Sequence, residues 1–158
     1  MASPTRGEYI TLVRGIDELM CASAAIDCFD WSGLFGAGPS RGANRAIPGQ
    51  PGAVARQHVR GELFVDLSFR CLGSVNVDGL AQAASFRRPN VVRRIHEVRH
   101  FLTGASGQQL GLKLTTGDGT STAPVTFKAF GSVEFPAPAI AEFSVLISVP
   151  SGLFPIPA

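Results

Sequence analysis

The sequence has few charged residues, few cysteines, and only one tryptophan and one tyrosine. Charged residues make up 16% of its 158 residues, and Trp31 and Tyr9 are the single tryptophan and the single tyrosine. No apolar run approaches the roughly 18 residues of a membrane-spanning helix, so a membrane partner is not expected. Hydrophobic residues make up 45% of the chain, which excludes intrinsic disorder. We therefore expect one folded domain covering residues 1–158.

The three cysteines give no sign of a disulfide framework or a metal centre. No two of the three cysteines are spaced as a C-x-x-C pair, and their number is odd. They are Cys21, Cys28 and Cys71. Neither the count nor the spacing fits a zinc site. We expect buried thiols that pack as small hydrophobic side chains, and we expect no metal or other cofactor.

The charge balance limits the classes of partner. The formal net charge is +2, although twelve of the fourteen basic residues are arginine. A net charge this small does not indicate a basic surface that binds nucleic acid, so sequence-specific nucleic-acid binding is not expected. The first residues also lack a basic segment followed by an apolar core, so we expect no secretory signal and expect assembly in a cytoplasm.

Alternating apolar residues predict a mainly β fold. The clearest case is residues 62–72, where Leu63, Val65, Leu67, Phe69 and Cys71 share one face. The predicted strands cover residues 8–13, 26–31, 62–72, 109–115, 125–135 and 140–149, and the last three are expected to form a meander. Such a set of strands indicates an antiparallel β-sandwich or a rolled barrel.

One helix is predicted, over about residues 90–103. Pro89 suits a first helical turn, and Gly104 suits the end of the helix. Val91, Ile95, Val98 and Leu102 recur at helical spacing between them. We expect this apolar stripe to pack on the sheet.

Two segments have no hydrophobic pattern that assigns them to this core. Residues 32–61 hold seven glycines, three prolines and no acidic residue, and they are far longer than the usual connection of about 4 to 6 residues. We expect this loop or arm to bear contacts in an assembly and to be poorly ordered in a lone protomer. The last segment, residues 151–158, presents apolar side chains and is expected to dock on its own domain or on a neighbour.

The sequence contains one catalytic pattern, His96-Glu97-Val98-Arg99-His100, a literal H-E-x-x-H. In zinc hydrolases two such histidines hold the metal and the glutamate activates water. At about 100° per residue, however, His96 and His100 fall on the face opposite the apolar stripe. No third ligand follows at the spacing of the extended motif. A zinc hydrolase is thus the less favoured alternative, and we expect no enzyme.

A small binding module for peptide or sugar is a third possibility. It requires an aromatic platform, which a chain with one Trp and one Tyr does not indicate. Neither a phosphate-binding loop nor a nucleophile elbow is present either.

A resemblance to known proteins rests on one segment of the sequence. This segment is Arg41-Gly42-Ala43-Asn44-Arg45, followed by Ile47-Pro48-Gly49 and Gly52. It follows a strand that ends at Trp31 and precedes an alternating strand, a helix and further strands. This order resembles the N-terminal domain of siphophage distal tail proteins and related minor tail proteins. The likeness covers roughly residues 26–149.

The resemblance implies a β-sandwich with a packed helix that assembles into a ring, in this family commonly a hexamer. The implied partners are other copies of the chain, tail-tube proteins and tail-tip or baseplate proteins within the virion tail. Related tail-tube, terminator and connector subunits are alternatives. Longer members continue into a carbohydrate-binding-like domain, so receptor binding is not expected here. The candidate assembly contacts are Arg41, Asn44, Arg45, Ile47, Pro48, Arg56, Leu153, Phe154 and Ile156.

Overall fold

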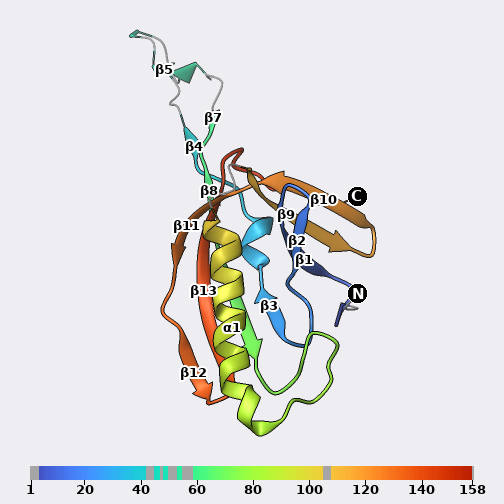
Figure 1. Ribbon diagram of the computed structural model, residues 1–158. Helices are drawn as coiled ribbons and strands as arrows, with labels where there is room; N and C mark the ends of the chain where they lie inside the picture. Colours follow the sequence, from blue (N-terminus) through green and yellow to red (C-terminus); the bar gives the residue numbers. More distant parts are fainter. Residues whose placement is uncertain are drawn as a thin grey trace.

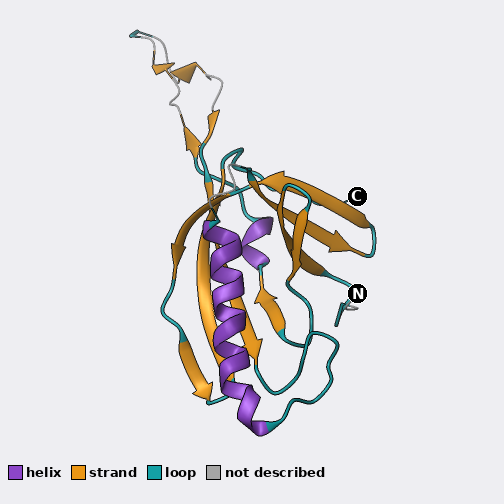
Figure 2. Ribbon diagram, viewed as in Figure 1, coloured by secondary structure: helices purple, strands orange, loops and turns teal. Residues whose placement is uncertain are grey.

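The computed structural model of the chain describes residues 4–41, 45–46, 48–49, 53–54, 59–104 and 108–157. Two antiparallel sheets and one long helix form the body of the molecule (Figures 1 and 2). Neither sheet closes on itself. Of the two predicted architectures, the β-sandwich with one helix is therefore the observed one. None of the helices in the described ranges is long and apolar enough to cross a membrane.

The first sheet has four strands in the order β10-β9-β1-β2. β1 (Tyr9–Arg14) and β9 (Leu110–Thr116) confirm two predicted strands, whereas β2 (Asp17–Met20) and β10 (Gly119–Pro124) were not predicted. Ile10, Leu12, Leu112 and Leu114 form its fully buried side. Gly15, at φ +66°, allows the tight turn between β1 and β2.

The second sheet has the order β11-β13-β8-β3, with β12 also paired to β13. Its centre is the pair β8 (Leu63–Leu72) and β13 (Ile140–Val149), which match along their full lengths. Phe69 lies opposite Phe143, and their stacked rings are 5.4 Å apart. The alternation predicted for β8 is confirmed, because one face is buried and the other is exposed or half-buried. β3 (Ile26–Asp30) forms one edge.

The predicted meander is wrong, because the last strands are divided between the two sheets. β10 belongs to the first sheet, and the chain crosses to the second at the buried Val125. The single strand predicted over residues 125–135 is two strands, β11 (Thr126–Phe130) and β12 (Glu134–Ala137). Gly131 lies between them, against the backbone of Ser144. Alternation shows which side chains share a face, but not which sheet a strand joins.

The helix α1 (Ala84–Thr103) is longer than predicted and contains Pro89 in its interior. It lies over the buried face of the second sheet, beside the first sheet (Figure 1). Val91, Val98 and Leu102 are buried as predicted, whereas Ile95 is only half-buried. The early turns pack on Gly73, where a Cβ atom would lie 1.8 Å from the carbonyl oxygen of Arg87. This tertiary contact extends the helix beyond the start that Pro89 suggests.

Between β3 and β8, the described parts of residues 32–61 form a short helix on the body and two strand pairs that project as an arm. A short 3-10 helix, η1 (Ser32–Phe35), comes first. β4 (Ser40–Arg41) then pairs with β7 (Val59–Arg60), and β5 (Arg45–Ala46) pairs with β6 (Ala53–Val54). These short pairs extend away from the body (Figure 1).

The C-terminal segment docks on its own domain. Leu153 forms a bridge to Ala37, and the hydroxyl of Ser121 donates to the carbonyl of Pro155 at 2.6 Å. Phe154 is 1% exposed and belongs to the core, whereas Leu153 and Ile156 are 51% and 53% exposed. The predicted docking thus occurs within the chain, and it uses one of the three apolar side chains.

The cysteines are buried as predicted. Burial raises the pKa of the Cys21 and Cys71 thiols to about 12, and it raises the pKa of Cys28 well above its ordinary value. The three thiols are therefore neutral at physiological pH and pack as apolar groups.

Candidate interaction surfaces

The H-E-x-x-H pattern lies on the outer face of α1. His96, Glu97 and His100 are all exposed, as the helical geometry predicts. The two imidazole rings are 6.3 Å apart between centroids. Across the described ranges, no three His, Cys, Asp or Glu side chains gather in a way that could hold a metal ion. A catalytic zinc needs a third ligand and a surrounding wall of protein. The pattern therefore has the geometry of a solvated helix face.

A shallow apolar depression of about 260 Å³ separates α1 from β12. We call it the helix groove. It is lined by Val92, Ile95, His96, Arg99, Val133 and Phe135. Just beyond these residues, the guanidinium of Arg88 lies 3.8 Å from the centroid of the Phe135 ring. The groove thus combines exposed apolar side chains with a basic border.

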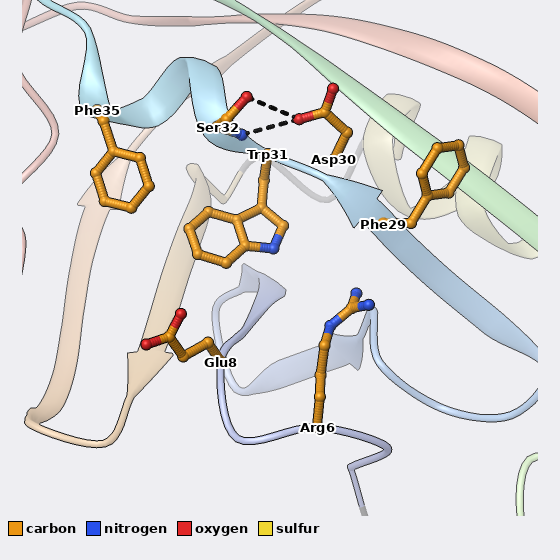
Figure 3. Close-up of a pocket in the computed structure, with 7 residues that line it drawn as sticks. All are labelled: Arg6, Glu8, Phe29, Asp30, Trp31, Ser32 and Phe35. Atoms are coloured by element: carbon orange, nitrogen blue, oxygen red, sulfur yellow. Dashed lines mark hydrogen bonds between the residues drawn. The ribbon is translucent and has the colours of Figure 1, made fainter.

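A second depression, of about 450 Å³, lies beside β3 and η1, at the opposite edge of the second sheet (Figure 3). We call it the aromatic pocket. The indole of Trp31 extends from the end of β3 toward the N-terminal segment, and its ring centroid is 5.5 Å from that of Phe35. The lining residues are Arg6, Glu8, Phe29, Asp30, Trp31, Ser32 and Phe35.

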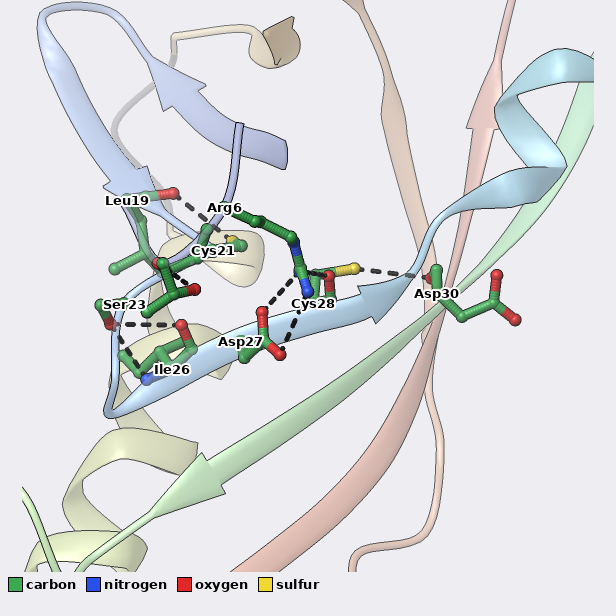
Figure 4. Close-up of polar contacts among 10 residues, drawn as sticks. Arg6, Leu19, Cys21, Ser23, Ile26, Asp27, Cys28 and Asp30 are labelled. Atoms are coloured by element: carbon green, nitrogen blue, oxygen red, sulfur yellow. Dashed lines mark hydrogen bonds and ion pairs between the residues drawn. The ribbon is translucent and has the colours of Figure 1, made fainter. Parts of the chain in front are cut away.

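Arg6, the only arginine among the residues that line the aromatic pocket, bonds to partners outside that lining. Arg6 forms an ion pair with Asp27 at 2.5 Å and also donates to the carbonyl of Cys28 (Figure 4). Asp30 instead accepts hydrogen bonds from the amide and hydroxyl of Ser32, at 3.2 and 2.8 Å. These bonds lower the pKa of Asp30. Among the described residues, neither Asp30 nor Glu8 has a basic partner. The lining residues therefore carry net negative charge, and Arg70, which lies 4.9 Å from the centroid of the Phe29 ring at the border, is paired with Glu142.

The aromatic pocket corrects the expectation that the chain has no aromatic platform. Phe29 and Trp31 are two residues apart, so the period of a strand places them on one side, and Phe35 comes from η1, which follows β3. The register between β3 and β8 also shifts between Cys28 and Asp30, and such a bulge redirects side chains locally. The signal in the sequence is the local density of aromatic residues around Asp30.

The candidate assembly contacts are divided between described and undescribed parts of the chain. Arg41 and Arg45 lie on β4 and β5, and Pro48 is exposed in the arm. Asn44, Ile47 and Arg56 lie outside the described residues. Leu153 is exposed near the root of the arm, Ile156 is exposed beside β10, and Phe154 is buried in the core.

No protein-family model matches the chain, and no curated protein sequence matches it. A structural similarity exists with a chain in the structure of the phage p2 baseplate in its activated conformation with Sr. The TM-score is 0.60 at 8% sequence identity. The match covers 90% of this chain and 44% of the baseplate chain, so this chain spans less than half the length of that protein. At this identity the likeness shows a shared fold.

Proposed function

We propose that this chain is a structural subunit of a tailed bacteriophage that forms a ring at the distal end of the tail tube and joins the tube to tip or baseplate proteins. The observation that carries this proposal is the shared fold with a phage baseplate chain over 90% of the sequence. The resemblance of residues 41–52 to distal tail proteins supports the same role independently. The role is geometric and needs no catalytic group.

The surface of the protein suits a ring. A closed ring needs two different, complementary faces on each protomer, and a stable contact buries about 800 Å² on each partner. That is roughly a tenth of the 9028 Å² surface of this chain. The helix groove, the aromatic pocket, the arm and the exposed apolar residues of the C-terminal segment can supply this area. We propose six copies per ring, as in the family that the sequence resembles.

The arm is the second element of the proposal. Two-residue strand pairs carry few hydrogen bonds, and fixing a residue costs about 1 to 2 kcal/mol of backbone entropy. A neighbouring subunit that covers the arm would offset this cost. We therefore place Arg41, Arg45 and Pro48 at contacts with a neighbour. Leu153 at the arm root and Ile156 beside β10 complete this set of contacts.

Labelling of virions tests the position in the tail. Antibody raised against this chain, carrying gold particles, is imaged by negative stain on phage that encodes the chain. We expect label only at the junction of tube and tip. Label along the whole tube would instead identify a tube subunit, and label at the head-proximal end would identify a terminator or connector.

A further inference from the structure

We infer that, in the ring, the aromatic pocket of one copy packs against the helix groove of the next copy. This inference rests on the proposed function, because it names the partner and the two faces of the ring contact. It assigns the negative pocket and the basic groove to the same interface. The partner is a second copy of this chain.

The two surfaces have the placement that a head-to-tail contact requires. The aromatic pocket borders β3, which is one edge of the second sheet. The helix groove borders β12, which joins the sheet at the other side, through β13. A rotation that brings one edge of a protomer to the opposite edge of its neighbour generates a ring when it closes.

Both surfaces expose large apolar side chains. Phe29 and Phe35 in the pocket, and Val92 and Phe135 in the groove, are each between 40% and 53% exposed. Aromatic side chains are enriched at the buried centres of protein interfaces. Burial of apolar area contributes about 25 cal/mol per Å² removed from water. These four side chains would form the centre of the contact.

The charges around the two apolar centres are complementary. Asp30 and Glu8 border the pocket without a basic partner among the described residues. On the groove side, Arg99 likewise has no carboxylate partner there, and Arg88 interacts with a ring and a carbonyl. Opposite charges across an interface favour the correct partner and fix its register, whereas like charges oppose association. Because each copy carries both complementary surfaces, we assign a second copy as the partner.

Charge reversal tests the pairing. The variants Asp30→Arg and Arg99→Glu each place like charges across the contact, so we expect association to weaken at least tenfold in sedimentation or light scattering. The double variant Asp30→Arg with Arg99→Glu restores opposite charges, and association should recover most of the loss. Asp78→Arg, at an exposed position of the connection between β8 and α1, is the matched control and should leave association unchanged. Thermal unfolding verifies that each variant is folded.

Cysteine cross-linking gives an independent readout. Phe35→Cys and Val92→Cys, combined in one chain, should form disulfides between copies on oxidation, giving ladders of covalent oligomers. The native cysteines are buried, so the wild-type chain and each single variant should give no ladder. If rings form but give no disulfide ladder, and both charge reversals leave association unchanged, the inference is overturned. The proposed function would not be affected by that result. A wild-type chain that stays monomeric at high concentration overturns both.

Discussion

The amide of Gly38 donates a hydrogen bond to the carbonyl of Gly152 at 2.7 Å. This bond joins the root of the arm to the C-terminal segment, two parts of the chain that are far apart in sequence. A Cβ atom on Gly38 would lie 1.9 Å from the carbonyl oxygen of Gly61, and one on Gly152 would lie 2.2 Å from the same atom. Three backbone segments therefore meet where only glycine fits. The arm leaves the body from a fixed base.

Replacing Gly38 tests this close packing. In Gly38→Ala the new methyl group overlaps the Gly61 carbonyl, so the backbone must shift, at a cost of about 1 to 3 kcal/mol. We expect a lower midpoint of thermal unfolding, by about 2 to 4 °C for each kcal/mol. Gly117→Ala is the matched control, because nothing lies within 4 Å of its Cβ position. Equal effects of the two substitutions would contradict the close approach.

Docking of the C-terminal segment predicts different roles for Phe154 and Ile156. Phe154→Ala empties a site that is 1% exposed, so the free energy of unfolding should fall by about 3 to 5 kcal/mol. Ile156→Ala changes a side chain that is half exposed and should alter stability by less than about 0.5 kcal/mol in the protomer. Denaturant titration of both variants measures the difference. A small effect of Phe154→Ala would mean that the segment is not docked in solution.

Arg14 is expected to hold the end of α1. Its guanidinium donates to the carbonyls of Phe101, Leu102 and Gln108, at 3.1, 2.9 and 2.8 Å. It thus satisfies carbonyl groups at the helix C-terminus, where a positive charge is also favoured. Arg14→Ala should cost about 1 to 3 kcal/mol and speed amide exchange in the last turn of α1.

The control for Arg14 is Arg99, an exposed arginine of the same helix. Arg99→Ala should change the stability of the protomer by less than about 0.5 kcal/mol. Arg14→Lys keeps the charge but not the planar set of donors, so it should recover only part of the loss. Full recovery by lysine would show that charge alone matters.

The buried thiols predict both reactivity and pH dependence. At pH 8 a thiol reagent should modify none of the three cysteines in the native protein and all three in urea. The folded-state pKa values of Cys21 and Cys71 are raised to about 12 from an ordinary value of 9.0. Their contribution to stability is therefore complete below pH 9 and is lost as the pH rises toward 12. Rapid labelling of the native protein at pH 8 would contradict their burial.

The sequence predicted the fold class well where one face of a strand is buried. In β8, apolar and polar residues alternate because only one side meets the core, so its bounds are nearly those predicted. β13 follows the same rule and matches its predicted range. β2 and β10 were missed because they are edge strands with few apolar residues, and their pairing depends on neighbours distant in sequence.

The candidate surfaces were less predictable, because most of them depend on contacts between residues that are distant in sequence. The outward position of His96 and His100 follows from helical geometry alone, and the structure confirms it. The aromatic pocket depends on the approach of Arg6 and Glu8 from the N-terminal segment to β3 and η1. The burial of Phe154 likewise depends on tertiary packing. No local pattern in the sequence encodes these long-range contacts.

The mass of the purified protein in solution, measured by light scattering beside negative-stain imaging and zinc analysis, tests the central claim most directly. The account predicts metal-free rings of about six protomers. A monomer that carries one zinc ion per chain would contradict it, and would return attention to His96, Glu97 and His100.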